Sequence, residues 1–166
     1  FNQVRYVLGS DPNKAPLFVR VASEDKERIR IGNIIKAMLM ELTQDKLAHD
    51  LEARSRQVIR LLGETVKPNP TTGGVDGRRV VVFIENAHRL HENVIRAIKD
   101  LREHDYNGVA PLFSVVLVGQ EPLLSKVNKY GEVRCRVASY ELCPAEGWMT
   151  YEKRVGLIKA VYKDVV

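Results

Sequence analysis

The chain has 166 residues, of which 45% are hydrophobic and 28% are charged, and its net charge is +5. This length suits one soluble domain, and no apolar run approaches the ~20 residues that a membrane span requires, which excludes a membrane-spanning class. Two cysteines, Cys135 and Cys143, are too few for a disulfide scaffold and lack a zinc-ligand spacing. We therefore expect reduced thiols, a cytoplasmic location and no membrane partner. The basic balance permits nucleic acid as a partner.

The first half of the chain predicts one strand and two helices. A β-rich run at Leu17 to Ala22 follows a turn segment rich in Pro, Asn and Asp. Apolar residues then recur at helical spacing from Ile29 to Leu42 and from Asp45 to Gly63, so each segment predicts a helix with one buried face. The segment Lys67 to Gly77 holds two prolines, three glycines and two threonines, which predicts a loop.

The second half predicts further alternation of strands and helices. Arg79 to Ile84 is a continuous apolar run after a basic start, which is typical of a strand buried on both faces of a parallel sheet. The remaining predicted elements are a helix at His91 to His104, a buried strand at Leu112 to Val118, a short helix at Pro122 to Tyr130, a weaker strand at Val137 to Leu142 and a helix at Met149 to Tyr162. This alternation predicts an α/β fold with a parallel, doubly wound sheet.

Polar side chains follow the two predicted buried strands. The first strand ends in Glu85-Asn86-Ala87-His88 and the second in Gly119-Gln120. In open parallel sheets, ligands bind at the carboxyl ends of the strands. A carboxylate at such a position suits Mg²⁺, which prefers one or two carboxylates plus phosphate oxygens, and an amide on the neighbouring strand suits contact with a γ-phosphate or a water.

The two stretches VVVFIENAHRL and VVLVGQEPLL, separated by a helix, resemble the Walker B and sensor 1 strands of AAA+ ATPases. More narrowly, they resemble the ATPases of DNA transposition, namely the phage Mu B protein and its TniB and TnsC relatives, and the ExeA-type secretion ATPases share the pattern. The resemblance covers about Leu17 to Leu142. It implies a P-loop NTPase sheet in which residues 1–145 form the AAA+ core and residues 146–166 begin the helical lid.

The resemblance also implies roles for individual residues and implies ATP and Mg²⁺ as cofactors. Glu85 occupies the position of the Mg²⁺-associated Asp, Asn86 that of the catalytic Glu, and Gln120 that of sensor 1. Arg134 and Arg136 fall where the family places an arginine finger that reaches a neighbouring subunit. The residues alone also allow simpler roles: a helix N-terminal charge for Glu85, a turn or cap for Gln120, packing or capping for His88, and a solvated pair beside an edge strand for the two arginines.

Two features depart from the family pattern. An amide has no basic oxygen near neutral pH, so Asn86 cannot act as a general base, and we expect ATP hydrolysis to be slow or absent. No GxxxxGK[ST] phosphate loop occurs in the chain, and TTGGVDGRR lacks its Lys-Ser/Thr pair. We expect that the chain begins just after the first strand and the phosphate loop and stops within the lid. The alternative is a degenerate domain that does not bind nucleotide.

Basic residues after the first strand are candidates for contact with a DNA backbone, on the basis of the same resemblance. The candidates are Lys26, Arg28, Arg30, Arg54 and Arg56. The alternative is an ordinary solvated surface, because Glu24 to Arg60 carries eight basic and seven acidic residues. The sequence shows no aromatic platform for stacked bases, which favours double-stranded DNA over single strands.

Three functions remain open at this stage. The first is an ATP-dependent DNA-binding regulator of transposition that selects target DNA, activates a transposase and forms a ring or helical filament. The second is a non-catalytic AAA-like interaction module, which Asn86 and the missing phosphate loop favour. The third is a secretion ATPase of the ExeA type.

Overall fold

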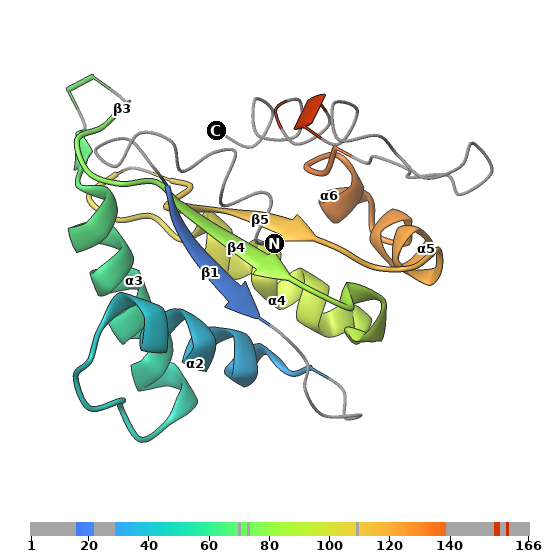
Figure 1. Cartoon of the computed structure of the whole chain (residues 1–166), viewed down its shortest axis with the longest axis horizontal. Helices are drawn as coiled ribbons and strands as arrows, with labels where there is room; N and C mark the ends of the chain where they lie inside the picture. The colour runs from blue at the N-terminus through green and yellow to red at the C-terminus, as the bar shows by residue number, and fades with distance from the viewer. Residues whose placement is uncertain are drawn as a thin grey trace.

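A parallel sheet of three strands organises the fold (Figure 1). Its order is β1 (Leu17–Val21), β4 (Val80–Ile84) and β5 (Phe113–Leu117), so β4 is the central strand. Both strand pairings are parallel. The expected α/β fold with a parallel sheet is therefore confirmed, and each of these three predicted strands agrees with the observed one to within one residue at either end.

The computed structural model describes residues 16–21, 29–69, 71–72, 74–108, 110–138, 155–156 and 159, with the backbone alone at 68, 74 and 75. The domain boundary expected after residue 145 lies outside these residues. Of the helix expected at Met149 to Tyr162, the described residues Val155, Gly156 and Lys159 are helical. No helix in the described part of the chain has both the length and the apolar character that crossing a bilayer requires.

The two faces of the sheet carry different side chains because successive residues of a strand point to opposite sides. The strand residues of β1 and β4 that lie in the main hydrophobic core are Leu17, Val19, Val21, Val80, Val82 and Ile84. The opposite face carries a smaller cluster of Phe18, Val81, Phe83 and Val116. All five residues of β4 are buried, as the unalternated apolar run predicts for a central parallel strand.

Three long helices pack on the first face of the sheet and close the main core (Figure 1). They are α2 (Ile31–Leu42), α3 (Leu51–Val66) and α4 (Glu92–Glu103). Their fully buried large side chains include Ile34, Ile35, Met38, Leu39, Val58 and Leu62. Each such aliphatic side chain contributes about 1.5–3 kcal/mol when removed from water. Within the described residues the long helices cover this one face. A doubly wound sheet has helices on both faces, and the described residues do not show that arrangement.

The start of α3 differs from the prediction. The helix begins at Leu51 rather than Asp45, because the Asp50 carboxylate accepts a hydrogen bond from the Ala53 backbone N–H over 2.7 Å and caps the helix. The residues before the cap form a loop, in which the Ala48 N–H donates to the Gln57 side chain at 3.0 Å. Local capping therefore outweighs the apolar periodicity that suggested an earlier start.

The segment predicted as a loop contains a short antiparallel ribbon of β2 (Pro68–Asn69) and β3 (Gly74–Val75). The Asn69 side chain accepts a hydrogen bond from the Thr71 N–H at 3.0 Å, an arrangement that favours a chain reversal. Two further strand predictions need correction. β5 is half-buried except for the buried Phe113, and no described strand pairs with its outer edge. In the strand expected at Val137 to Leu142, the described residues Val137 and Ala138 are not in a strand.

Candidate functional site

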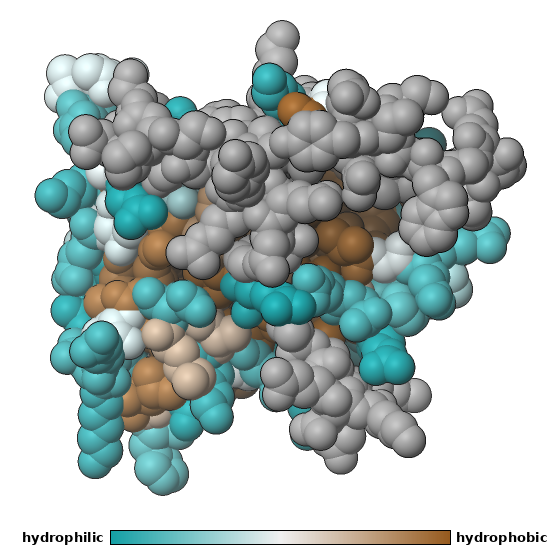
Figure 2. Space-filling view, in the orientation of Figure 1, coloured by the Kyte–Doolittle hydropathy of each residue, from teal (hydrophilic) through white to brown (hydrophobic). Residues whose placement is uncertain are grey.

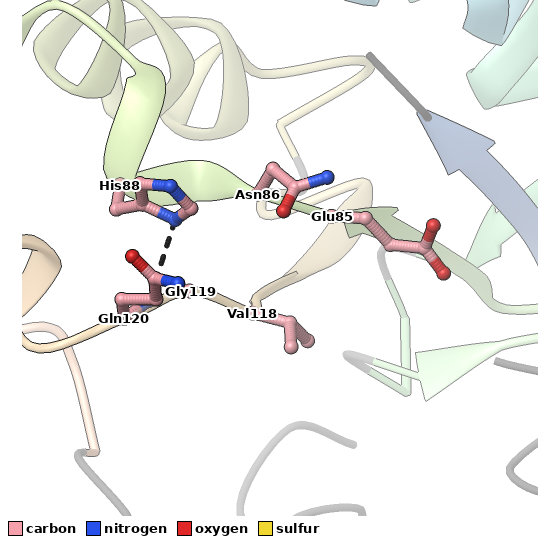
Figure 3. A pocket seen from close by; sticks show the side chains of 6 residues that line it. All are labelled: Glu85, Asn86, His88, Val118, Gly119 and Gln120. Atoms are coloured by element: carbon pink, nitrogen blue, oxygen red, sulfur yellow. Dashed lines mark hydrogen bonds between the residues drawn. The ribbon is translucent and has the colours of Figure 1, made fainter. Parts of the chain in front are cut away.

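The carboxyl ends of β4 and β5 meet at a shallow pocket of about 330 Å³ (Figure 3). After β4 the chain enters a 3₁₀ turn, η1 (Ala87–Arg89), and after β5 it enters the short helix α5 (Pro122–Asn128). The pocket is lined by Glu85, Asn86, His88, Val118, Gly119 and Gln120. The structure therefore brings together Glu85, Asn86 and Gln120, because neighbouring parallel strands end at the same edge of a sheet.

Asn86 adopts a left-handed backbone conformation, with φ 53° and ψ 35°. Asn is one of the few residues other than Gly that tolerate this region, because a short polar side chain can interact with the local backbone and so offset the steric cost of Cβ. The turn after β4 thus provides a structural reason for Asn at this position, independent of any reaction. The Asn86 side chain lies exposed at the pocket, where its amide can donate or accept a hydrogen bond.

Glu85 forms an ion pair with Arg20 of β1. The Glu85 backbone N–H donates to the Val21 carbonyl at 3.1 Å, which holds the residue beside β1. An Arg20 guanidinium nitrogen then donates to Glu85 Oε2 over 2.7 Å, and the two side chains are 49% and 28% exposed. Figure 3 shows the Glu85 carboxylate directed toward β1 and away from His88 and Gln120. The carboxylate therefore lines one side of the pocket and faces a guanidinium.

The two turns that form the pocket are fastened to each other. The Ala87 N–H donates to the Val118 carbonyl at 2.9 Å, and the Gln120 N–H donates to His88 Nδ1 at 3.4 Å. Gly119 lies so close to the first turn that a Cβ at this position would be 2.8 Å from the His88 backbone nitrogen. The close approach requires glycine at position 119, and these contacts hold the two turns together.

Lys126 of α5 stabilises the turn after β4. Its ammonium group donates to the carbonyl oxygens of His88 and Leu90 over 2.6 Å and 2.8 Å. These carbonyls end a short 3₁₀ turn, where a cation interacts favourably with the unpaired acceptors. Lys126 thereby holds η1 against α5, the helix that follows the other pocket strand.

Glu85 is the one carboxylate among the residues that line the pocket, and it is already paired with Arg20. Mg²⁺ requires near-octahedral oxygen coordination, with at least one or two carboxylates available to it. Among the described residues, no group of three or more His, Cys, Asp or Glu side chains could hold a metal ion. The pocket instead offers neutral amides and an imidazole as hydrogen-bonding groups.

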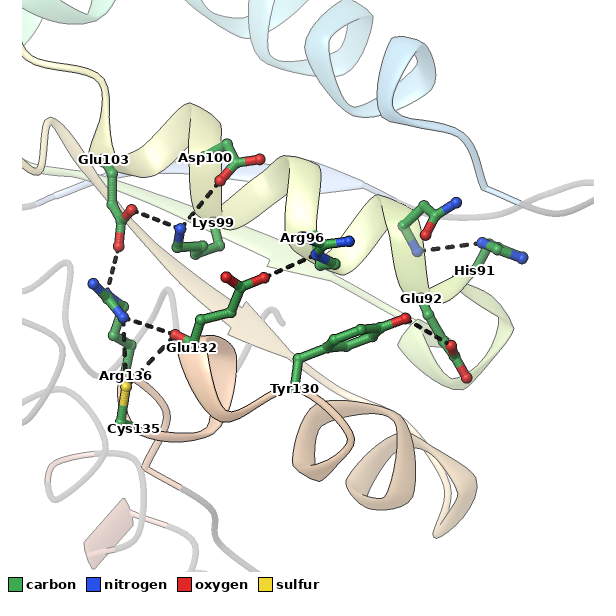
Figure 4. Close-up of polar contacts among 11 residues, drawn as sticks. His91, Glu92, Arg96, Lys99, Asp100, Glu103, Tyr130, Glu132, Cys135 and Arg136 are labelled. Carbon is green, nitrogen blue, oxygen red and sulfur yellow. Dashed lines mark hydrogen bonds and ion pairs between the residues drawn. The ribbon is translucent and has the colours of Figure 1, made fainter.

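Arg134 and Arg136 lie near α6 (Gly131–Arg134), away from the pocket. Arg136 pairs with Glu103 in the last turn of α4 and also donates to the Glu132 carbonyl at 2.8 Å (Figure 4). The pocket lies beside the other end of α4, and a helix of 12 residues is about 18 Å long. The exposed Arg134 side chain has no hydrogen bond or ion pair with the described residues. Of the two, Arg134 has the guanidinium that a neighbouring molecule could contact.

An ion-pair network joins α4 to the segment that contains α6 (Figure 4). Arg96 pairs with Glu132 at 2.8 Å and lies over the Tyr130 ring, and Lys129 pairs with Glu92 at 2.6 Å. The hydrogen bond from Lys129 lowers the pKa of Glu92 below its ordinary value, with help from Tyr130. Glu92 in turn raises the pKa of Lys129. The network adds charge pairs to the apolar contact by which Val133 of α6 is buried in the main core.

The candidate DNA-binding residues are partly occupied by contacts within the chain. Arg54 donates to the Ala48 carbonyl at 2.7 Å and so holds the loop before α3. Arg56 pairs with Glu52 one turn away on the same helix, at 3.3 Å. Hydrophilic side chains line this α3 edge of the molecule, on the left of Figure 2. Arg30 is exposed before α2, while Lys26 and Arg28 lie outside the described residues.

Two residues of the site were not found from the sequence, Arg20 and Lys126. Arg20 interrupts an apolar strand one position before its end, on the opposite face from Val19 and Val21. That position at the end of a strand is the signal that could have identified it. Lys126 carries no comparable signal, because its role depends on how α5 packs against η1.

No family model matched the chain, and searches of curated proteins and of solved structures also produced no significant match.

Proposed function

We propose that this chain is the α/β core of an AAA+-type, nucleotide-dependent and DNA-binding assembly protein of the kind that regulates transposition. The observation that supports the proposal is the meeting of Glu85-Asn86 and Gly119-Gln120 at one pocket, on adjacent parallel strands. The resemblance of VVVFIENAHRL and VVLVGQEPLL to Walker B and sensor 1 strands implies this juxtaposition. The pocket volume of about 330 Å³ lies at the lower end of the range for small-molecule sites.

In this proposal the nucleotide acts as a switch for assembly rather than as a substrate for rapid turnover. The Gln120 amide at the pocket contacts the terminal phosphate and so distinguishes ATP from ADP. Asn86 cannot accept a proton from an attacking water, and loss of a general base slows such reactions by ~10²–10⁴-fold. A bound nucleotide would therefore persist long enough to stabilise a ring or a helical filament.

The proposal gives magnesium no role, because Arg20 already pairs with the carboxylate that would hold it. Nucleotide recognition in the proposal rests on the amides, on His88 and on the backbone of the two turns. Arg134 is the better candidate for contact with a neighbouring subunit, since Arg136 is engaged by Glu103. Duplex DNA and a transposase are the proposed partners, on the resemblance and the net charge of +5.

Electron microscopy of the full-length protein tests this function. The protein is mixed with duplex DNA at low salt, with a non-hydrolysable ATP analogue, with ADP or with no nucleotide. We expect ordered rings or filaments with the ATP analogue, and their loss in Gln120→Ala. Gln44→Ala is the matched control, because Gln44 is an exposed glutamine away from the pocket. Absence of ordered assemblies under every condition would contradict the proposed function.

A second candidate is a non-catalytic interaction module that keeps the fold but binds no nucleotide. The Arg20–Glu85 ion pair favours it, because the pair supplies within the protein the positive charge that a bound metal would bring. Isothermal titration calorimetry separates the two candidates. Heat of binding with ATP that disappears in Gln120→Ala supports the first, and no heat with ATP or ADP supports the second.

A further inference from the structure

His88 is the side chain that joins the two turns of the pocket. It belongs to η1 after β4, and its Nδ1 accepts a hydrogen bond from the Gln120 N–H of the loop after β5, at 3.4 Å (Figure 3). A neutral imidazole accepts at one ring nitrogen and carries its proton on the other. The contact therefore favours the tautomer of His88 that carries its proton on Nε2.

The backbone of His88 is itself held from two sides. Lys126 donates to its carbonyl oxygen at 2.6 Å, and Gly119 packs directly against its backbone nitrogen. Neither contact involves the imidazole, so the ring faces Gln120 from a backbone that is held in place. The imidazole is half-buried, while Gln120 is exposed.

We infer that His88 is a positioning residue for Gln120. The hydrogen bond to Nδ1 holds the Gln120 backbone in the position from which the Gln120 side-chain amide reaches a ligand in the pocket. This assignment deepens the proposed function and rests on it for the identity of that ligand, a nucleoside triphosphate whose terminal phosphate the amide contacts. The link between His88 and Gln120 exists in the ligand-free protein and can be tested there.

The test compares four variants of the ligand-free, ¹⁵N-labelled protein. His88→Asn keeps an acceptor near the position of Nδ1, His88→Gln keeps a polar group near Nε2 instead, and His88→Ala removes both. The matched control is His91→Ala, because His91 Nδ1 also accepts a backbone N–H, that of Asn93 at 3.2 Å, but at the start of α4. The measured quantity is the rate of exchange of the Gln120 amide proton with water.

We expect exchange at Gln120 to be about tenfold faster in His88→Ala and His88→Gln and within about threefold of wild type in His88→Asn and His91→Ala. The ¹⁵N shifts of the neutral His88 ring should show a bare Nδ1 and a protonated Nε2. A proton on Nδ1, or equal protection of Gln120 in His88→Gln and His88→Asn, would overturn the assignment. Asn replaces Nδ1 and Gln replaces Nε2. General damage to the fold would therefore not make Gln120 exchange faster in His88→Gln than in His88→Asn.

A ligand-bound measurement separates this assignment from the proposed function. The ratio of the affinities for ATP and ADP should fall about tenfold in His88→Ala and recover in His88→Asn, because discrimination depends on the placement of Gln120. If neither nucleotide binds to wild type or to any variant, the proposed function fails. The exchange rates in the ligand-free protein then still decide whether His88 positions Gln120.

Discussion

Arg20 donates to Glu85 Oε2 over 2.7 Å, and this contact joins the end of β1 to the turn that follows β4. The sequence pattern implies that Glu85 is associated with a metal ion, whereas in the structure its carboxylate faces a guanidinium. Both side chains are partly exposed, so solvent screens the pair and its energy is small. The pair also bears on the chemistry of the site, because it places a positive charge beside the carboxylate that would attract a cation.

The strength of this pair can be measured with a double-mutant cycle of Arg20→Met and Glu85→Gln in urea unfolding. We expect a coupling energy of about 0.2–1 kcal/mol that declines at high salt. The cycle isolates the pair, because other contacts of Arg20 are lost equally in both backgrounds. The exposed Arg56–Glu52 pair provides a reference for an ordinary helix-surface interaction. A coupling energy of zero at low salt would show that the two side chains do not interact.

The same variant bears on the role of magnesium. In the wild-type protein, affinity for an ATP analogue should change less than about threefold when Mg²⁺ is removed with a chelator. Arg20→Met frees the Glu85 carboxylate, and its affinity should become dependent on Mg²⁺ by about tenfold. Arg56→Met is the control, because it frees a carboxylate outside the pocket. Strong dependence on Mg²⁺ in the wild-type protein would mean that a metal ion displaces Arg20.

The left-handed backbone at Asn86 predicts an unusual order of stabilities. Asn86→Gly should be nearly neutral, while Asn86→Ala should lower the free energy of unfolding by about 1 kcal/mol, because Ala adopts this conformation less readily. Asn93→Ala in α4 is the control at a helical position. Thermal or urea unfolding measures all three. Equal stability of Asn86→Gly and Asn86→Ala would contradict the left-handed conformation.

Asn86 also sets the expected rate of ATP turnover. Asn86→Glu restores a carboxylate that can act as a general base, and we expect turnover to rise by about an order of magnitude or more. Asn86→Gln is the matched control, because Gln is as long as Glu and meets the same backbone strain without being a base. Phosphate release under steady state measures the rates. Equal rates in the Glu and Gln variants would show that position 86 does not limit hydrolysis.

The sequence predicted the central features of the sheet because they depend on local patterns. The apolar runs at β1, β4 and β5 gave the strands, and their polar ends gave the meeting of Glu85 with Gln120. The Arg20–Glu85 and Lys126–His88 contacts could not be predicted, since each joins residues more than 35 positions apart through packing. Hydrophobic periodicity also does not predict the left-handed conformation of Asn86 or the late start of α3 at the Asp50 cap, because both depend on local backbone geometry.

Acid should weaken the network that joins α4 to α6. The hydrogen bond from Lys129 lowers the pKa of Glu92 in the folded protein below its ordinary value of 4.5. The contribution of Glu92 to stability is therefore fully present above that value and is lost as the pH falls through the lowered pKa. Urea unfolding at a series of pH values should show Glu92→Gln less stable than wild type at neutral pH and equal to it in strong acid.

Glu52→Gln provides the control for this measurement, because Glu52 is an exposed carboxylate paired within its own helix. Its difference from wild type should be small throughout, because the pair is exposed to solvent. If the deficit of Glu92→Gln stayed constant down to strong acid, ionisation of Glu92 would not be the source of the stabilisation.

Gly63 in α3 permits the close approach of Tyr106, which lies between α4 and β5. A Cβ at position 63 would be 2.5 Å from atoms of the Tyr106 ring. Gly63→Ala should therefore lower the free energy of unfolding by about 1–3 kcal/mol despite the higher helix propensity of Ala. The same change at Gly131 has no atom within 4 Å of the new Cβ and should be harmless. Adding Tyr106→Ala should relieve part of the penalty of Gly63→Ala, and purely additive effects would contradict the clash.

The measurement that tests the central claim most directly is an NMR titration of the ¹⁵N-labelled protein with a non-hydrolysable ATP analogue. The proposed function predicts saturable shifts of the amide signals from Glu85 to His88 and from Val118 to Gln120, because these residues line the pocket. ADP should shift the same signals with a smaller change at Gln120. Shifts confined to other parts of the molecule, or no saturable shifts with either nucleotide, would contradict nucleotide binding at this pocket.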